Sequence, residues 1–198
     1  MRIFVTALML AVALTSSAFA GNVALSGLGA SATCGGTPSC TLTTFVPGNA
    51  IDGSLATEWV APGGTVGPYL LVNLGQLYTI DSVTISGVGN ASESIGFEVF
   101  VGTSSSVATL EGGTPITGGS QIIQADGTAW NDTYSVSTAS PIQYILYDVT
   151  TSNSGAGDTT HDDAFTTEIS ADATPEPGTI GLIGSGLLAL GFTLRRKK

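Results

Sequence analysis

The chain has 198 residues, and its 5 Lys and Arg against 15 Asp and Glu give a formal net charge of −10 at pH 7. All five cations lie near the two ends, so residues 21–174 hold 14 of the acids and no Lys or Arg. Without cations to contact phosphates, this part of the chain is not expected to bind nucleic acid or anionic lipid surfaces. The acidity also fits the plainer role of keeping an exported protein soluble.

The first 20 residues have the pattern of a secretory signal peptide. A single cation, Arg2, precedes an apolar run from Ile3 to Leu14, and the small-x-small sequence Ala18-Phe19-Ala20 forms a cleavage site. The run is too short and too weakly flanked to be a stable membrane anchor. We therefore expect the mature chain to begin at Gly21 and residues 21–173 to form one domain of ordinary size.

The two cysteines of the chain, Cys34 and Cys40, enclose a short stretch with the sequence GGTPS. In an exported protein such a pair usually forms a structural disulfide, which here would stiffen a turn. The alternatives fit less well, because a lone C-x5-C pair is a poor zinc site and redox pairs more often have the spacing C-x-x-C.

The rest of the domain is rich in Gly, Ser and Thr and has short runs of β-type residues without a convincing amphipathic helix. Short strands separated by turn residues are typical of an all-β fold, a β-sandwich or jelly roll. In one run the alternation places Phe97, Val99 and Val101 on one face, with Glu98 opposite. Loops are expected at 112–120 and 151–163. The expected strands are 69–74, 80–86, 94–101, 121–124, 134–137, 142–149 and 165–170.

Three stretches near the start of the domain follow one another in a recognisable order. Asn49–Trp59 reads NAIDGSLATEW, Tyr69–Gly75 reads YLLVNLG, and Tyr78–Ile85 reads YTIDSVTI. This order resembles the discoidin family, also called F5/8 type C, whose fold is the galactose-binding-like jelly roll. Asn22–Ser26 and Phe165–Ile169 are similar to its first and last strands, so the resemblance covers nearly the whole domain. It implies a discoidin-like jelly-roll β-sandwich, a fold that often binds glycans.

The resemblance also implies a structural calcium site. Similar domains hold calcium with this turn and with a Glu of the last strand, which here correspond to the Ala50 carbonyl, Asp52, Thr57 and Glu168, with Ser54 as a weaker ligand. Calcium prefers such mixed oxygen ligands, and close carboxylates without a cationic side chain need a metal ion or water. In the alternative interpretation Asp52 only stabilises the turn and Glu168 is a surface acid.

The sequence offers little that could carry catalysis or bind a second metal ion. His161 beside Asp162 and Asp163 could form a metal cluster, although a solvated loop explains it more simply. The sequence has no nucleophile or metalloprotease motif and no carboxylates with recognisable catalytic spacing, so we predict that the protein is not an enzyme.

The two tryptophans differ in their surroundings along the chain. Trp59 follows the turn of the discoidin-like pattern and is expected in the core. Trp130, followed by Asn131, is the better candidate for contact with a sugar, because a flat aromatic ring matches the apolar face of a pyranose. The family's common arginines are replaced by Glu58 and by Gln143-Tyr144, so arginine would not contribute to recognition.

The C-terminal residues 174–198 have three parts: Pro175-Glu176-Pro177, an uncharged run at 177–194, and four cations at 195–198. The run has 18 residues, or about 27 Å as a helix, against about 30 Å of hydrocarbon, so it is just long enough to span. The cations should stay on the cytoplasmic side and leave the domain outside. A tail anchor, or a hydrophobic helix docked on a core, would explain the run but not the two prolines at its entrance.

The three parts in this order resemble the PEP-CTERM sorting signal of Gram-negative bacteria. The resemblance implies transient anchoring in the inner membrane through 178–194 and cleavage near Pro175, Glu176 and Pro177 by an exosortase, a membrane cysteine protease. The processed protein is then expected at the cell surface, the outer membrane or the extracellular matrix. Two functions remain open: a carbohydrate-binding module that holds exopolysaccharide, and a non-catalytic structural biofilm protein without a specific ligand.

Overall fold

The computed structural model describes residues 21–37, 43–61, 66–88, 94–116, 121–123, 129–137, 140–153 and 164–174. The contacts within it define a compact unit, Asn22–Ala173, to which the following description refers. The predicted signal peptide, the sorting signal from Pro175 onward, Cys40 and the residues His161–Asp163 lie outside the described residues. Within the described part of the chain, no helix is long and apolar enough to cross a membrane.

The described residues form ten strands and three short helical turns. The strands are β1 Ser31–Thr37, β2 Trp59–Ala61, β3 Val66–Tyr78, β4 Ile80–Val88, β5 Ser94–Gly102, β6 Gln121–Ile123, β7 Ala129–Ser135, β8 Ile142–Asn153, β9 Ala164–Thr166 and β10 Glu168–Ala173. The helical turns are η2 Ser26–Leu28, η3 Pro47–Ile51 and α2 Val107–Glu111.

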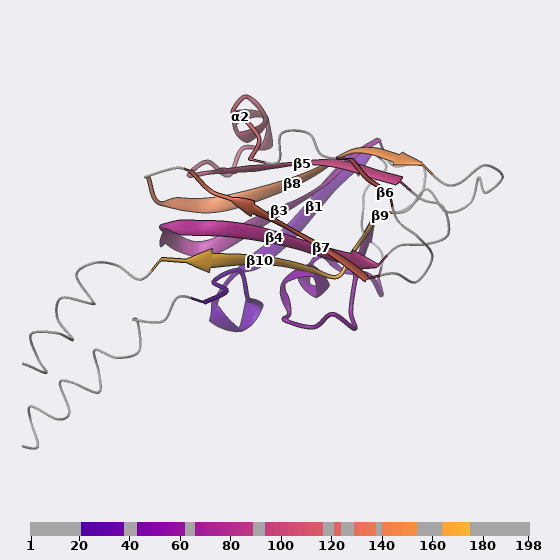
Figure 1. Ribbon diagram of the computed structural model, residues 1–198, viewed down its shortest axis with the longest axis horizontal. Coiled ribbons are helices and arrows are strands. Elements are labelled where there is room, and N and C mark those ends of the chain that lie inside the picture. The colour runs from indigo at the N-terminus through magenta and orange to yellow at the C-terminus, as the bar shows by residue number, and fades with distance from the viewer. Residues whose placement is uncertain are drawn as a thin grey trace, which may run out of the picture. The chain divides into compact units, whose positions relative to one another are not determined.

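Two antiparallel sheets form the layers of a β-sandwich (Figure 1). One sheet has the strand order β1-β3-β8-β5-β6 and the other the order β10-β4-β7, while β2 and β9 form a separate pair. Helix α2 lies on the outer side of the five-stranded sheet (Figure 1). The all-β sandwich that the sequence predicts is therefore confirmed.

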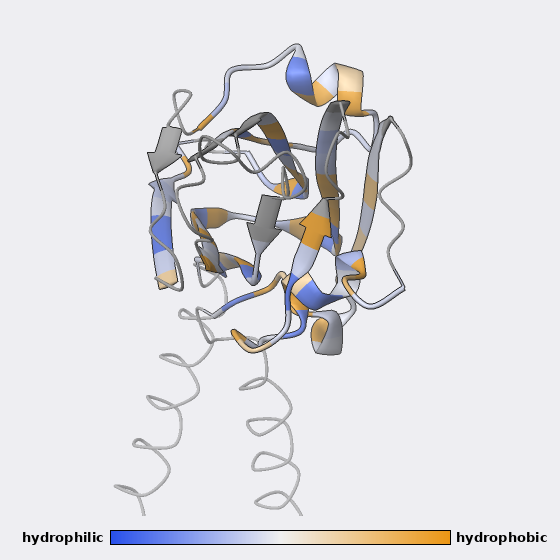
Figure 2. Ribbon diagram, turned by 90° about the vertical axis from the view of Figure 1, so that its right-hand side faces the viewer, coloured by the Kyte–Doolittle hydropathy of each residue, from blue (hydrophilic) through white to orange (hydrophobic). Residues whose placement is uncertain are grey.

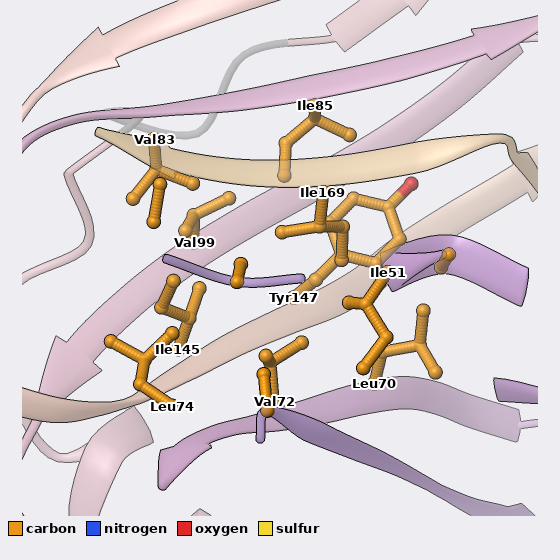
Figure 3. Packing of buried hydrophobic residues seen from close by; sticks show 14 of the residues in the cluster. Ile51, Leu70, Val72, Leu74, Val83, Ile85, Val99, Ile145, Tyr147 and Ile169 are labelled. Carbon is orange, nitrogen blue, oxygen red and sulfur yellow. The ribbon is translucent and has the colours of Figure 1, made fainter. Parts of the chain in front are cut away.

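The hydrophobic core lies between the two sheets because each strand turns alternate side chains inward. Val83 and Ile85 of β4 and Ile169 of β10 approach the core from one layer, and Val72 and Tyr147 from the other (Figure 3). All five side chains are fully buried. Hydrophobic segments occur along the strands of both layers (Figure 2). The inward face predicted for β5 is also confirmed where its side chains are described.

The strand pattern differs from the prediction at the start of the domain. Asn22–Ser26, expected as the first strand, contributes a single bridge between Asn22 and Asp172. The first strand is instead β1, whose sequence SATCGGT has little of the apolar alternation that indicates a strand.

β3 continues past Gly75, which has a φ of 82°. A Cβ added to Gly75 would lie 3.0 Å from the Gly29 carbonyl oxygen, so glycine permits this close approach.

The later strands also depart from their predicted bounds. β7 covers Ala129–Ser135 instead of 134–137, and β8 reaches Asn153, so residues 151–153 belong to a strand and not to a loop. The segment expected as one final strand is divided at Thr167, whose N–H donates to the Ser86 carbonyl at 2.9 Å. Strand ends in this chain depend on partners far away in the sequence, which periodicity within one segment does not reveal.

The two ends of the folded unit lie side by side. Asn22 bridges to Asp172, and the Val23 N–H donates to the Ala171 carbonyl at 2.8 Å. Ala173 pairs with Ile80 at the beginning of β4. The first and last residues of the unit Asn22–Ala173 are therefore neighbours in space. The opposite end of β4, near Ser86, lies about 20 Å away at about 3.3 Å per residue.

Candidate functional site

The turn that follows η3 is closed by its own polar side chains. Asn49 Nδ2 donates to the carbonyl of Thr44 at 3.1 Å and to that of Glu58 at 2.9 Å. Asp52 Oδ1 accepts from the Ser54 N–H at 2.8 Å, and Asp52 Oδ2 accepts from Thr57 Oγ1 at 2.7 Å. Asp52 thus has the Asx-turn role that the simpler interpretation assigned to it.

The fold also brings Glu168, the first residue of β10, against this turn. Glu168 is 7% exposed, and its Oε2 accepts from the Gly53 N–H at 3.1 Å. Its Oε1 accepts from Asn22 Nδ2 at 3.4 Å. Burial raises the pKa of Glu168 to about 7; the hydrogen bond from Gly53 opposes this shift, and the charge of Asp52 adds to it. A buried carboxyl group therefore lies beside a second one with no cationic side chain to compensate it.

The oxygen atoms of this turn and of Glu168 are of the kinds that calcium binds. Among the described residues no three His, Cys, Asp or Glu side chains are grouped to hold a metal ion. A metal at this turn would therefore use two carboxylates, Asp52 and Glu168, together with neutral oxygens. Thr57 and Ser54 supply hydroxyls, and Ala50 is buried in η3 at the start of the turn. Calcium accepts such mixed sets of carboxylate, hydroxyl and carbonyl oxygens.

A hollow of about 170 Å³ is lined in part by Thr167, the residue before Glu168. Its floor comes from paired strands, because Ser86 lies opposite Asn131 and Gly87 lies opposite Trp130 in the β4–β7 register. Two other parts of the chain complete the lining of the hollow: the exposed turn residue Leu55, and Thr167 between β9 and β10. The residues that line the hollow include Leu55, Ser86, Gly87, Trp130, Asn131 and Thr167.

The hollow combines an apolar wall with polar groups at its edge. Leu55 is 68% exposed, and Asn131 is also exposed. Trp130 is half-buried, because its ring stacks on Phe97 with centroids 6.0 Å apart and an interplanar angle of 26°. The Trp130 Nε1–H is buried and has no hydrogen-bond acceptor within the described structure. The predicted ligand residues Trp130 and Asn131 thus lie together in one hollow, although Trp130 is less exposed than the sequence suggested.

Trp59 lies in the core, as its position in the turn pattern suggested. It is fully buried, and its ring meets that of Tyr147 edge to face with centroids 6.3 Å apart. Cys34, in β1, is disulfide-bonded, as the predicted pair requires, while its expected partner Cys40 lies outside the described residues.

A second group of carboxyl groups, which the sequence did not indicate, lies on the outer face of the five-stranded sheet. Glu98 of β5 is directly opposite Asp148 of β8. Burial raises the pKa of Asp148 to about 6, and the charges of Glu111 and Glu98 raise it further. Only strand register reveals this group, because its members are far apart in the sequence.

The C-terminal segment and the domain have separate matches among known proteins. Residues 173–197 match the PEP-CTERM protein-sorting motif, which indicates an exported, membrane-sorted protein. A search of curated protein sequences finds no match.

Several solved structures share the fold of the domain. The CBM32 of AlyQ in complex with 4,5-unsaturated mannuronic acid is 23% identical with a TM-score of 0.50, covering 71% of this chain and 92% of its own. Chitosan-binding module 1 from the chitosanase/glucanase of Paenibacillus sp. IK-5 is 22% identical with a TM-score of 0.50, covering 76% and 97%. A fucolectin from striped bass (Morone saxatilis) serum is 17% identical with a TM-score of 0.53, covering 78% and 49%.

Proposed function

The chain carries a PEP-CTERM sorting motif behind a domain with the discoidin-like fold of CBM32 modules, and from this we propose that it is an exported, non-catalytic carbohydrate-binding protein. Its ligand is an exopolysaccharide, held in the hollow between the turn at Leu55 and the beginning of β7. Exosortase processing releases the domain from the inner membrane to the cell surface or the extracellular matrix.

The hollow is the observation that supports carbohydrate binding most strongly. Leu55 and Trp130 offer apolar surface to the face of a pyranose, while Ser86, Asn131 and Thr167 offer hydroxyl and amide groups to its hydroxyls. Its volume of about 170 Å³ is below the roughly 300–1,000 Å³ of pockets that enclose drug-sized ligands. A hollow of this size suits a single sugar ring at a chain end or branch.

A matched pair of leucine variants tests this site. Leu55→Ala removes part of the apolar wall, whereas Leu77→Ala changes another exposed leucine, in the bulged end of β3. Leu55 and Leu77 are 68% and 54% exposed, so neither change should affect stability by more than about 0.5 kcal/mol. We expect Leu55→Ala to weaken binding to exopolysaccharide from the producing cells about tenfold, or about 1.4 kcal/mol, with Leu77→Ala unchanged.

The alternative function is a structural matrix protein without a specific ligand. It predicts no saturable binding by the wild type, by calorimetry or in polysaccharide pull-downs, and no difference between the two leucine variants. Equal loss of binding in both variants would also speak against the hollow as the site.

Processing by an exosortase is the second part of the proposal. The protein isolated from the cell surface should begin near Gly21 and lack residues 195–198, which intact mass spectrometry would show. Replacing Pro175, Glu176 and Pro177 with Ala should leave the protein in the inner membrane. A surface protein that retains the basic residues 195–198 would contradict this route.

Calcium at the turn is the third part. The carboxyl groups of Asp52 and Glu168 would hold the ion together with Thr57, Ser54 and the Ala50 carbonyl, and the ion would neutralise their repulsion. Because calcium would bind only the folded state, it should raise the melting temperature. At 100 times the dissociation constant the gain is about 2.7 kcal/mol.

The calcium site can be tested with two aspartate variants. Asp52→Ala should abolish the response to calcium, whereas Asp162→Ala in the stretch 151–163 should preserve it. Identical melting curves for the wild type in calcium and in a chelator would show that Asp52 is only a turn residue.

A further inference from the structure

The residues of the turn, called segment 52–57 below, border both the proposed calcium ligands and the hollow. Leu55, which lines the hollow, belongs to the same segment as the carboxyl group of Asp52. Thr167, which also lines the hollow, directly precedes the carboxyl group of Glu168. Two lining residues are therefore held by the two pieces of chain that carry the carboxyl groups.

Hydrogen bonds within segment 52–57 determine where Leu55 lies. Asp52 accepts from the Ser54 N–H at 2.8 Å and from Thr57 Oγ1 at 2.7 Å. Thr57 Oγ1 also donates to the Ser54 carbonyl at 3.1 Å, and Ser54 Oγ accepts from the Ala56 N–H at 3.2 Å. The Leu55 side chain is 68% exposed, so these bonds, and not burial, fix its position.

One hydrogen bond joins segment 52–57 to β10. The Gly53 N–H donates to Glu168 Oε2 at 3.1 Å. The neighbouring Thr167 N–H donates to the carbonyl of Ser86, and Thr167 and Ser86 both line the hollow. In this closed arrangement Leu55 faces the other lining residues. A movement of the segment away from Glu168 would carry Leu55 away from Thr167 and remove part of the apolar wall.

The charges of the two carboxyl groups oppose the closed arrangement. Asp52 precedes the residue that is bonded to Glu168, and residues 21–174 contain no Lys or Arg to compensate the two like charges. Their repulsion favours a segment that moves away from β10, whereas a cation held by both groups favours the closed one. A glycan that contacts Leu55 binds only the closed fraction, so its apparent affinity is reduced by that fraction.

We propose that calcium binding at the turn and glycan binding in the hollow strengthen each other, because both use the closed form of segment 52–57. This inference rests on the proposed function and adds that its calcium site regulates its carbohydrate site. The coupling is reciprocal: calcium and the glycan raise each other's affinity by the same factor. Asp52 and Glu168 act as positioning residues, since neither lines the hollow.

Titration with exopolysaccharide from the producing cells, in calcium and in a chelator, tests the coupling. Calorimetry of the protein isolated from those cells, at equal ionic strength, gives the dissociation constant in both media. We expect about fivefold tighter binding in calcium, at the lower end of the usual range for coupled sites. Magnesium should have little effect, because it demands a smaller octahedral site and gives up its water reluctantly.

Two aspartate variants show whether the effect passes through the turn. Asp52→Asn keeps an oxygen that can accept from the Ser54 N–H but removes the charge, so its affinity for the polysaccharide should be the same in both media. Asp81→Asn is the matched control, because it makes the same change at an exposed position of β4 about 17 Å from Ser86. This control should keep the effect of about fivefold.

The NMR signals of two leucines test the segment without any glycan. Calcium should shift the methyl signals of Leu55, which the spectrum of Leu55→Ala identifies. The methyl signals of Leu77 should stay in place, because Leu77 lies at the end of β3 and outside the segment. In Asp52→Asn neither leucine should respond to calcium.

The possible results separate this inference from the function on which it rests. If the polysaccharide binds equally well in calcium and in a chelator, the coupling is wrong and carbohydrate binding stands. A calcium effect that persists in Asp52→Asn would also overturn the coupling, because it would then come from calcium on the polysaccharide itself. Leu55 methyl signals that ignore calcium have the same consequence. If the polysaccharide binds in neither medium, the proposed function fails as well.

Discussion

The domain contains no Lys or Arg, yet carboxyl groups come together at two places in it. The surroundings of these two clusters differ. Asp52 and Glu168 meet at the end of the sandwich, where Glu168 is buried and accepts hydrogen bonds from Gly53 and Asn22. Glu98, Glu111 and Asp148 meet on the outer face of the five-stranded sheet, where Glu98 and Asp148 are half-buried on adjacent strands.

The difference shows what turns close acids into a candidate site. At the turn, the Thr57 hydroxyl donates to Asp52, and hydrogen bonds from the Gly53 N–H and from Asn22 Nδ2 hold Glu168 in place. On the sheet, the charges of Glu111 and Glu98 repel that of Asp148, and within the described part of the chain these acids are not grouped to hold a metal ion. We therefore expect the first group to respond to calcium and the second to respond to pH alone, and Glu168→Gln and Asp148→Asn probe that contrast.

The largest effect is expected for Glu168→Gln, and its sign should depend on calcium. With calcium at 100 times its dissociation constant, the variant should lose most of the gain of about 2.7 kcal/mol in unfolding free energy. In a chelator at about pH 8 it should instead be more stable than the wild type by about 1 kcal/mol, because it removes an uncompensated buried charge. Urea unfolding in both media measures the difference.

The pH dependence of Glu168 follows from the direction of its pKa shift. Its folded-state pKa, about 7, lies above the ordinary value of 4.5, so the folded state holds the proton more tightly. The resulting stability is fully present below about pH 4.5 and is lost as the pH rises through about 7. The advantage of Glu168→Gln in a chelator should therefore disappear near pH 4. An advantage that is the same at every pH would contradict this explanation.

The second effect concerns Asn22, which connects the first residues of the domain to β10. Its Oδ1 accepts from the N–H groups of Ala24 and Ala171, both at 2.9 Å, and both of these residues are fully buried. Asn22→Ala leaves the two donors without this acceptor and should lower the unfolding free energy by about 2 kcal/mol. Asn73→Ala is the control, because Asn73 Oδ1 accepts from the N–H of the exposed Gly75 and from Nε2 of the half-buried Gln143, and both donors can turn to water. Comparable losses in both variants would refute this role of Asn22.

The third effect tests the acids on the sheet. The pKa of Asp148, about 6, lies above the ordinary 3.8, so its contribution to stability is fully present below about pH 3.8 and is lost as the pH rises through about 6. Asp148→Asn should thus stabilise the domain at about pH 8, by about 1 kcal/mol after allowance for solvent screening. Unlike Glu168→Gln, it should do so equally in calcium and in a chelator. A change of sign with calcium would place a metal site on the sheet as well.

The smallest effect is expected for Thr166→Val in the core. The hydroxyls of Thr166 and Tyr147 are close enough to interact, but neither has a well-formed hydrogen bond within the described structure. Replacing a buried, poorly bonded hydroxyl with a methyl group should be neutral or stabilising by up to about 1 kcal/mol. A loss of stability in thermal unfolding would show that the two hydroxyls are bonded to each other.

The fold class could be predicted from the sequence because the patterns that indicate it each lie within a short stretch of the chain. The turn at Asp52, the Leu-Gly end of the following strand and the alternation in 94–101 are all readable within short windows. β1 was missed because its Gly, Ser and Thr carry no apolar alternation, and its strand conformation depends on pairing with β3. The extensions of β3 past Gly75 and of β8 to Asn153 likewise depend on partner strands.

The candidate site was predictable only in pieces. Asp52 and Glu168 were named through the resemblance to the discoidin family, and Trp130 and Asn131 through the chemistry of their side chains. Leu55, Ser86 and Thr167 were not, because they come from three separate segments that meet only through the register of β4 with β7 and β10. The stacking of Trp130 on Phe97, which leaves Trp130 half-buried, is a tertiary contact of the same kind.

The most direct test of carbohydrate binding in the hollow uses the two tryptophans of the chain. Each gives one indole N–H signal in the NMR spectrum of the labelled protein, one from Trp130 at the hollow and one from Trp59 in the core. On titration with the exopolysaccharide, the Trp130 signal should shift in a saturable way while that of Trp59 stays in place. If the glycan binds and the Trp130 signal does not move, the hollow is not the binding site.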